Sequence, residues 1–299
     1  MTICPEQLRK ALHHVWPSAS LPALPDLSQQ LNLITDSRKL AEGDVFVAVP
    51  GSQRDGREYI EQALASGASL VLAHTKESDV RLEGQVLFLP HLSLRLGELG
   101  RTLFDVPSGL EIIAVTGTNG KSSVTHYIAE LSEQLGTAAG VIGTLGVGRP
   151  GKLLESGLTT PGPLALQATL GELARQGVKR VALEASSHAL DQQRLDAVNV
   201  NVGVFTNLTR DHLDYHGSMA AYAAAKAKLF RRTELALAVV NGDDPDEPPL
   251  FIDHGGRNQV VLVEGIGHIA LIAHGGDDLK RLFQNIRQTR LAARAHELA

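Results

Sequence analysis

The chain has 299 residues, which is enough for two domains of ordinary size. Hydrophobic residues make up 43% of it and charged residues 20%, which is typical of a globular protein with a sizeable core. The net charge of -5 argues against a dedicated nucleic-acid binder, because such proteins usually carry a basic patch. We therefore expect no nucleic-acid partner.

The cysteine content and the N-terminus favour the cytoplasm. Cys4 is the single cysteine and cannot form an internal disulfide, which suits a reducing compartment. The N-terminal sequence MTICPEQLRK lacks the basic and then apolar pattern of a signal peptide, and no apolar run is long enough to span a bilayer. We expect a cytoplasmic protein without membrane insertion, and a monomer.

The first part of the chain has a small α/β pattern. Apolar runs predict strands at residues 44–49, 69–73 and 85–90. Residues 59–68 predict an amphipathic helix that ends near a glycine. The sequence DVPSGLE, which begins at Asp105, supplies the proline and glycine typical of a boundary. We therefore expect an N-terminal domain over residues 1–105.

From residue 111 onward, predicted strands alternate with predicted helices. The strands are expected at 111–116, 139–144, 180–186, 198–208 and 235–241. The helices are expected at about 122–135, 163–176 and 218–230. This alternation indicates a parallel sheet with helices on both faces, in which ligands bind beyond the carboxyl ends of the strands. We expect a central domain over residues 106–245.

After residue 241 the composition changes. Residues 242–258 are rich in proline, glycine and acidic residues and predict a loop, and residues 260–276 predict one or two strands. Residues 277–299 predict a basic amphipathic helix, which could face a membrane or a partner but is expected to pack on the protein. Its apolar residues are Leu279, Leu282, Ile286 and Leu291. We treat 246–299 as a separate C-terminal region.

Residues 112–135 combine a strand, a glycine-containing loop and a helix. Ile112–Val115 is a β-branched apolar run, and a loop with Gly120, Lys121 and Ser122 follows it. The predicted helix carries Val124, Ile128, Leu131 and Leu135 on one face. Such an arrangement cradles phosphate: backbone N–H groups face an anion, a lysine adds positive charge and a serine hydroxyl reaches Mg²⁺. The usual spacing would place a glycine at Val115, whereas the nearest one is Gly117.

Two further segments place polar residues after predicted strands. Glu184 lies near the end of one strand, where a carboxylate beside a phosphate loop is a natural ligand for Mg²⁺. The segment TNLTRDHLDYHG places His212 and three other acidic or histidine side chains after the next strand. A polar turn is the simpler interpretation, and no fitting spacing supports a zinc site. Lys226 lies on an alanine-rich helix, where most lysines are solvated.

Taken together, these segments closely resemble the Mur ligase family. The match is to its MurE branch, the UDP-N-acetylmuramoyl-tripeptide synthetases, and covers roughly residues 30–245. It rests on ITDSRKLAEGDVFVAVPGSQRDGREYI, VTGTNGKSS, LTTPGPLALQ, ALEASSHALDQQR and VFTNLTRDHLDYHGSMAAYAAAKAKLF. The resemblance implies a small N-terminal domain for a UDP-sugar, a central P-loop-type ATPase domain, and a C-terminal domain for an incoming amino acid.

The resemblance also implies site residues. It assigns ATP to Gly117, Thr118, Asn119, Gly120, Lys121, Ser122 and Ser123. It implies Mg²⁺ at Ser122, Glu184, His212 and Lys226, with Lys226 carbamylated, and catalytic roles for Lys121, Glu184, His212 and Lys226. It places the uridine end of the substrate at Thr35, Ser37, Ser52, Gln53 and Arg54. It places the muramoyl-peptide at Thr159, Thr160, Ser186, Gln192 and Arg194, whereas Leu158 replaces an asparagine of some relatives.

The expected reaction is an ATP-dependent amide ligation, in which an acyl-phosphate of UDP-MurNAc-L-Ala-D-Glu is attacked by a diamino acid. We expect meso-diaminopimelate rather than L-lysine. Residues 242–299 are too few for the family's C-terminal domain of about 100–150 residues, and its Asp-Asn-Pro-Arg signature is absent. Ile266 and Ile269 also replace a lysine and a glutamate of the family's terminal motif. The expectation is therefore a chain that lacks most of that domain.

Three hypotheses follow. The first is a ligase of the MurE type, and the second is a remnant that binds ATP or the UDP-substrate without turnover. The third is a ligase resembling folylpolyglutamate synthase. The early ITDSR and GDVFVAVPG segments argue against the third, because the resemblance assigns them to UDP-sugar recognition.

Overall fold

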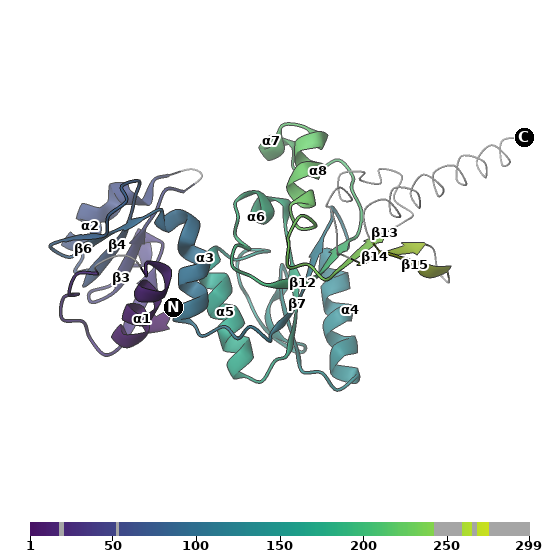
Figure 1. The fold of residues 1–299 in the computed structure, drawn as a ribbon, viewed down its shortest axis with the longest axis horizontal. Helices are drawn as coiled ribbons and strands as arrows, with labels where there is room; N and C mark the ends of the chain where they lie inside the picture. Colours follow the sequence, from purple (N-terminus) through teal and green to yellow (C-terminus); the bar gives the residue numbers. More distant parts are fainter. Residues whose placement is uncertain (18–20, 52–53, 242–258, 265–267, 275–299) are drawn as a thin grey trace, which may run out of the picture. The chain divides into compact units, whose positions relative to one another are not determined.

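The computed structural model describes residues 1–17, 21–51, 54–241, 259–264 and 268–274 (Figure 1). The chain divides into two compact units. The first comprises residues 1–107, 162–175 and 195–198, and the second comprises 108–161, 176–194 and the rest of the chain from 199. The helix predicted at 277–299 and the loop predicted at 242–258 lie outside the described residues.

The first unit is built on a mixed sheet. Its strands, in spatial order, are β1 (Thr2–Ile3), β2 (Leu31–Ile34), β3 (Val45–Ala48), β4 (Leu70–Thr75), β6 (Val86–Pro90) and β5 (Arg81–Glu83). β2, β3, β4 and β6 are parallel, whereas β1 and β5 pair antiparallel at the edges. The helices are α1 (Pro5–Val15), α2 (Ile60–Ala65), α3 (Leu92–Leu103) and α5 (Pro163–Arg175), with 3-10 turns η1 (Ser37–Lys39) and η2 (Gly56–Tyr59).

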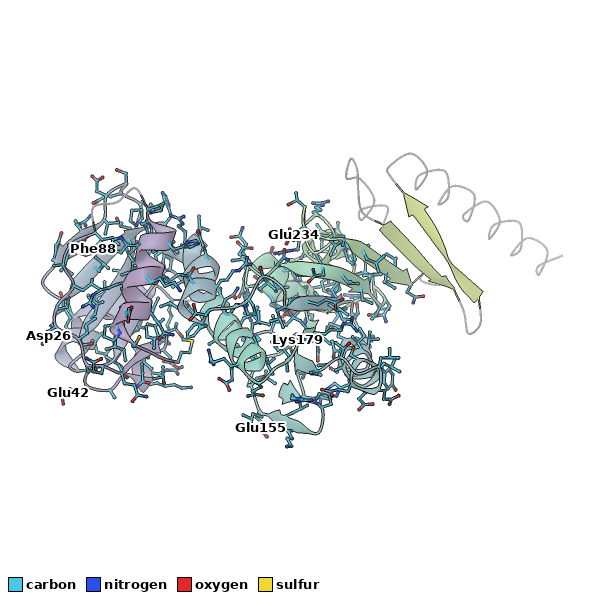
Figure 2. All side chains as sticks on the ribbon, turned by 60° about the horizontal axis from the view of Figure 1, so that its bottom comes forward. Asp26, Glu42, Phe88, Glu155, Lys179 and Glu234 are labelled. Atoms are coloured by element: carbon cyan, nitrogen blue, oxygen red, sulfur yellow. The ribbon has the colours of Figure 1, made fainter. Side chains whose placement is uncertain are left out.

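Both faces of this sheet are covered, because successive side chains of a strand point to opposite faces. Val45 and Val47 of β3 belong to a core cluster that contains apolar residues of α1 and α3. Phe46 and Ala48 belong to a second cluster on α2 and its neighbours. Phe88, labelled in Figure 2, packs against this second cluster. The near-continuous apolar runs of these strands are typical of a parallel sheet buried on both faces.

The second unit is built on a larger sheet with a parallel centre. Its strands, in spatial order, are β10 (Lys152–Leu154), β9 (Gly146–Arg149), β8 (Ala139–Gly143), β11 (Arg180–Glu184), β7 (Glu111–Thr116), β12 (Val200–Phe205), β13 (Leu237–Asn241), β14 (Gln259–Glu264) and β15 (His268–His274). The strands from β8 to β14 are parallel. The helices are α4 (Lys121–Gln134), α6 (Ser187–Asp191), α7 (Leu213–His216) and α8 (Met219–Ala227).

The predicted fold class, an α/β protein with a parallel-sheet central part, is confirmed, and each predicted strand has a counterpart in the structure. The predicted apolar face of α4 is only partly buried: Ile128 packs against a core cluster, but the C-terminal leucines do not. Leu131 and Leu135 are 56% and 80% exposed, whereas the helix buries Thr125, Ala129 and Ser132. These small side chains let α4 lie close to β8 and β11, and Leu131 and Leu135 are left exposed.

Parallel pairing brings four strand ends to one edge of the sheet. β7 ends at Thr116, β8 at Gly143, β11 at Glu184 and β12 at Phe205. The polar segments that follow these strands are far apart in the chain but meet at this edge. The carboxyl edge of a parallel sheet is where ligands bind in such folds, and the candidate site lies there.

Candidate functional site

The loop between β7 and α4 has a conformation that requires glycine. Gly117 has φ +148° and Gly120, which caps the start of α4, has φ +83°. Both values lie in the region that L-residues rarely adopt. A Cβ on Gly117 would also collide with the Thr206 hydroxyl. The loop therefore depends on glycine at positions 117 and 120.

The segment after β12 holds this loop in place. The N–H of Thr118 donates to the Asn207 carbonyl at 2.8 Å, and the N–H of Asn119 donates to the Asn207 side chain at 2.9 Å. The Thr206 hydroxyl donates to the Asn119 carbonyl at 2.6 Å. The Thr118 hydroxyl also accepts from the N–H of Thr209 at 2.9 Å. The loop is thus fixed by its neighbouring strand end as well as by its own glycines.

Lys121 begins α4 and folds back over the loop. Its Nζ donates to the carbonyls of Gly117 and Thr118 at 2.9 and 2.8 Å. Burial lowers the pKa of Lys121, and the nearby Glu184 carboxylate opposes that effect. The first turn of a helix has N–H groups without intrahelical partners, which favour an anion. The loop, the lysine and the helix start together form a site suited to phosphate.

Lys226 is buried beneath the same loop, unlike a typical lysine on an alanine-rich helix. It is 1% exposed, and its Nζ donates to the Gly117 carbonyl at 2.7 Å and lies 4.3 Å from the centre of the Tyr222 ring. Burial, helped by the neighbouring Lys121, lowers the pKa of Lys226 to about 7. Lys228, one half-turn away, instead forms an exposed ion pair with Asp191.

Glu184 ends β11 with its carboxylate held by one neighbouring residue. The side chain is 1% exposed. Its Oε1 accepts from the N–H of Thr144 at 3.0 Å, and its Oε2 lies 3.2 Å from the Thr144 hydroxyl oxygen. A Cβ on Gly143 would collide with this carboxylate, so a larger residue there would displace the Glu184 side chain.

His212 precedes α7 in a left-handed conformation with φ 51°. Its ring centre lies 4.9 Å from that of His188, which also contacts Tyr215 and His216. The His216 ring lies 3.0 Å from the Ser187 hydroxyl. Burial lowers the pKa of both His188 and His216. A neutral imidazole at this edge can accept a hydrogen bond or act as a ligand.

These residues surround one cavity of about 330 Å³. Of the predicted site residues, those that line it are Thr118, Asn119, Gly120, Lys121, Ser122, Ser123, Thr159, Glu184, Ser186, His212 and Lys226. The structure therefore brings together side chains from four strand ends and α8. Glu155, labelled in Figure 2, follows β10 and precedes the segment that carries Thr159.

The remaining predicted muramoyl-peptide residues form a network beside the cavity. The Thr160 hydroxyl donates to the Glu184 carbonyl at 2.7 Å, and Arg194 donates to the Thr160 carbonyl at 2.8 Å. Arg194 also donates to the Gln192 side chain, which in turn donates to the Tyr215 hydroxyl. Burial lowers the pKa of Arg194. The network gives Arg194 and Gln192 fixed positions.

The predicted uridine residues belong to the first unit and do not line this cavity. Thr35 follows β2, and Ser37 begins η1. Arg54 lies 3.4 Å from the Tyr59 hydroxyl, to which it donates. Ser52 and Gln53 lie outside the described residues.

The donors at the cavity fit a nucleotide-bound Mg²⁺ better than a protein-only metal centre. Among the described residues, no group of three His, Cys, Asp or Glu side chains could hold a metal by itself. Ser122 and Glu184 instead offer hard oxygen atoms beside the phosphate loop. Mg²⁺ is usually held by one or two carboxylates together with substrate phosphates, so these residues suit it.

Several site residues were not predicted from the sequence. Thr144 holds Glu184, Thr206 and Asn207 hold the phosphate loop, and Tyr222 packs on Lys226. Thr144, Thr206 and Asn207 lie near the ends of the strands predicted at 139–144 and 198–208, so the rule that located Glu184 could have found them. Tyr222 carries no comparable signal, because its role depends on how α8 is buried.

Models of known families match both parts of the chain. The Mur ligase middle domain matches residues 115–264, and the Mur ligase family catalytic domain matches residues 32–99. A UDP-N-acetylmuramoyl-L-alanyl-D-glutamate--2,6-diaminopimelate ligase of Xanthomonas oryzae pv. oryzae is 48% identical over 246 residues, which are 82% of this chain and 49% of that protein. A ligase of the same name from Coxiella burnetii is 46% identical over 77% of this chain and 47% of that protein.

Comparison with solved structures gives the same family as the comparison of sequences. A UDP-N-acetylmuramoyl-L-alanyl-D-glutamate--2,6-diaminopimelate ligase has a TM-score of 0.67 and 33% identity, covering 86% of this chain and 53% of that one. The MurF ligase of Thermotoga maritima shares the fold, with a TM-score of 0.52, 22% identity, and coverage of 79% of this chain and 51% of that one. The chain belongs to the Mur ligase family, and it spans about half the length of the curated relatives it matches. No described helix is both long and apolar enough to cross a membrane.

Proposed function

We propose that the chain acts as an ATP-dependent ligase of peptidoglycan precursor synthesis. It joins a diamino acid, meso-diaminopimelate rather than L-lysine, to UDP-MurNAc-L-Ala-D-Glu. The observation that carries this proposal is the single cavity that holds Lys121, Glu184, Lys226 and Thr159 together. The names of the relatives, which are 2,6-diaminopimelate ligases, support the choice of amino acid. The reaction takes place in the cytoplasm, with the chain as a monomer.

ATP is held by the loop from Gly117 to Ser123. The free N–H groups at the start of α4 face the phosphates, and Lys121 neutralises their charge after leaving the carbonyls of Gly117 and Thr118. Mg²⁺ supplies further neutralisation when bound, and Ser122, Glu184, His212 and a carbamylated Lys226 hold it. Phosphoryl transfer depends mainly on positioning and on charge neutralisation, so the loop N–H groups, Lys121 and the Mg²⁺ ligands suit the reaction.

The substrate residues fall into two sets. Thr35, Ser37, Ser52, Gln53 and Arg54 hold the uridine end on residues 1–105. Thr159, Thr160, Ser186, Gln192 and Arg194 hold the muramoyl-peptide on the central domain, residues 106–245. The positive charge of Arg194, fixed by Gln192 and Thr160, suits an anionic group of the substrate.

The reaction has two steps. The substrate carboxylate attacks the γ-phosphorus of ATP and ADP leaves, which produces an acyl phosphate. The amino group then attacks the acyl carbon, inorganic phosphate leaves, and the amine gives up a proton. The described residues serve the first step, in which charge at the phosphoryl group is greatest.

The first step can be tested alone. The chain is incubated with ATP, Mg²⁺ and UDP-MurNAc-L-Ala-D-Glu in hydroxylamine, which converts an acyl phosphate into a stable hydroxamate. We expect hydroxamate and ADP from the wild type and from Lys228→Met, and neither from Lys121→Met. ADP formation that does not depend on the UDP-substrate would contradict the proposal. Binding of both ligands without ADP would favour the alternative of a binding remnant.

A further inference from the structure

One side chain joins the carboxylate of Glu184 to the peptide-binding segment. Thr144, directly after β8, places its Oγ1 3.2 Å from Glu184 Oε2 and 2.9 Å from Thr159 Oγ1. Its N–H separately donates to Glu184 Oε1. Neither the sequence motifs nor the proposed site residues include Thr144.

The number of protons on each group limits which of Thr159, Thr144 and Glu184 donates to which. An ionised carboxylate only accepts hydrogen bonds, and a threonine hydroxyl has one proton to donate. Thr144 Oγ1 is placed to donate to both Thr159 Oγ1 and Glu184 Oε2, but its single proton serves only one of them at a time. When that proton lies on the carboxylate, Thr159 donates to Thr144, and the Thr159 oxygen is left as an acceptor at the cavity.

The backbone reinforces this link. Thr160 donates its hydroxyl proton to the Glu184 carbonyl at 2.7 Å, and Ser156 bonds to the Gly143 and Leu158 carbonyls. The segment from Ser156 to Thr160 is thus attached to the ends of both β8 and β11. Glu184 is 1% exposed, and its carboxylate contacts both the N–H and the hydroxyl of Thr144. A change in the position of the carboxylate therefore also changes the contacts of Thr144.

We propose that Thr144 is a positioning residue that couples occupancy of the peptide site to metal–nucleotide binding at Glu184. A donor group of the substrate, such as a peptide N–H, bonds to the Thr159 oxygen and fixes the hydroxyl chain. Glu184 is then held in the orientation that suits a divalent cation. This inference rests on the proposed function, because it uses Glu184 as a metal ligand and Thr159 as a substrate contact.

The test measures how one ligand changes the affinity for the other. Calorimetry gives the affinity for ADP with Mn²⁺, with and without saturating UDP-MurNAc-L-Ala-D-Glu, and for ADP in a chelator. Thr144→Val removes the hydroxyl but keeps the size and the N–H. Thr144→Ser restores the hydroxyl, and Thr169→Val removes a hydroxyl that bonds only within α5. Melting temperatures verify folding, and Thr144→Ala replaces the valine variant if that one is unstable.

We expect the UDP-substrate to tighten ADP–Mn²⁺ binding in the wild type, in Thr144→Ser and in Thr169→Val. In Thr144→Val this enhancement falls by about tenfold, because a hydrogen bond to a charged group is lost. Affinity for ADP in chelator stays unchanged. Thr159→Val gives the same loss, and the double variant loses no more, because both act through one chain.

Two results would overturn the inference. If the wild type binds both ligands and Thr144→Val keeps the full enhancement, the coupling role is wrong and the proposed function stands. The same holds if Thr144→Val weakens ADP equally with and without metal, which marks a structural role. If the wild type binds neither ligand, the proposed function fails together with the inference.

Discussion

Lys121 and Lys226 donate to the same carbonyl oxygen, that of Gly117, at 2.9 and 2.7 Å. Two ammonium groups at one oxygen repel each other, and Lys121 is among the causes that lower the pKa of Lys226. The arrangement would be relieved if Lys121 turned to a phosphate or if Lys226 lost its positive charge. Carbamylation of Lys226 would do the latter and replace the charge with a negative one.

Lys226 should therefore react with carbon dioxide. Only a neutral amine attacks carbon dioxide, giving a carbamate and a released proton, and a pKa of about 7 leaves much of Lys226 neutral near physiological pH. With isotope-labelled bicarbonate, we expect a carbamate carbon signal by NMR in the wild type and in Lys228→Met. Lys226→Met should lack it. Equal signals in all three proteins would show that Lys226 is not the modified residue.

The same lysine should make stability depend on pH. Between about pH 7 and its ordinary pKa of 10.5, Lys226 is neutral in the folded state and protonated in the unfolded state. The unfolded state then binds more protons, so stability rises with pH; the cost of burial is fully present below about pH 7. In buffers free of carbon dioxide, the free energy of unfolding of the wild type relative to Lys226→Met should rise by about 1–2 kcal/mol from about pH 7 to about pH 9.

Denaturant unfolding of both proteins at each pH measures this difference. A constant difference, or one that falls as the pH rises, would contradict the buried position of Lys226.

Gly117 should be indispensable for nucleotide binding. Gly117→Ala adds a Cβ at φ +148° that meets the Thr206 hydroxyl, so the loop must shift. We expect ADP affinity to fall by about 100-fold, which corresponds to roughly 3 kcal/mol of strain and lost contacts. Gly109→Ala is the control, because nothing lies within 4 Å of its added Cβ. Wild-type ADP affinity in Gly117→Ala, measured by calorimetry, would rule out this loop as the phosphate site.

The buried Gln167 side chain should lower the stability of the first unit. It is 1% exposed, and neither its Nε2 nor its Oε1 has a hydrogen-bond partner among the described residues. Replacing an unpaired buried amide with an apolar side chain of similar size removes a desolvation cost, so Gln167→Met should raise stability by about 1 kcal/mol. Gln134→Met, at an exposed position of α4, should leave it unchanged. Destabilisation of Gln167→Met in urea would show that the amide has a partner such as a bound water.

The sequence predicts most of the parallel strands of both units, but not β2, not the short strands β1, β5, β9 and β10, and not how the helices pack. Apolar runs such as Ile112–Val115 mark buried parallel strands whatever surrounds them. Leu131 and Leu135 of α4 are exposed because close approach to the sheet selects the small residues Thr125, Ala129 and Ser132, whereas periodicity favours large aliphatic residues. The helices α1 and α3 were not predicted.

For the candidate site, too, the sequence predicts residues near strand ends but not residues whose position depends on helix packing. Glu184 ends a strand and Lys121 lies in the loop and helix start that follow one, so chain order alone places them at one edge of the sheet. The burial of Lys226 and its contact with Gly117 depend on how α8 packs against the rest of the unit, which no local sequence pattern encodes. Its resemblance to a family position, rather than its spacing, identified it.

The most direct test of the proposed ligase is product formation. The chain is incubated with UDP-MurNAc-L-Ala-D-Glu, ATP and Mg²⁺ and with either meso-diaminopimelate or L-lysine, and the UDP-linked species are weighed by mass spectrometry. We expect a mass gain equal to one diaminopimelate less one water, with ADP released in equal amount and little product from lysine. No gain with either amino acid, despite binding of both ATP and the UDP-substrate, would contradict it.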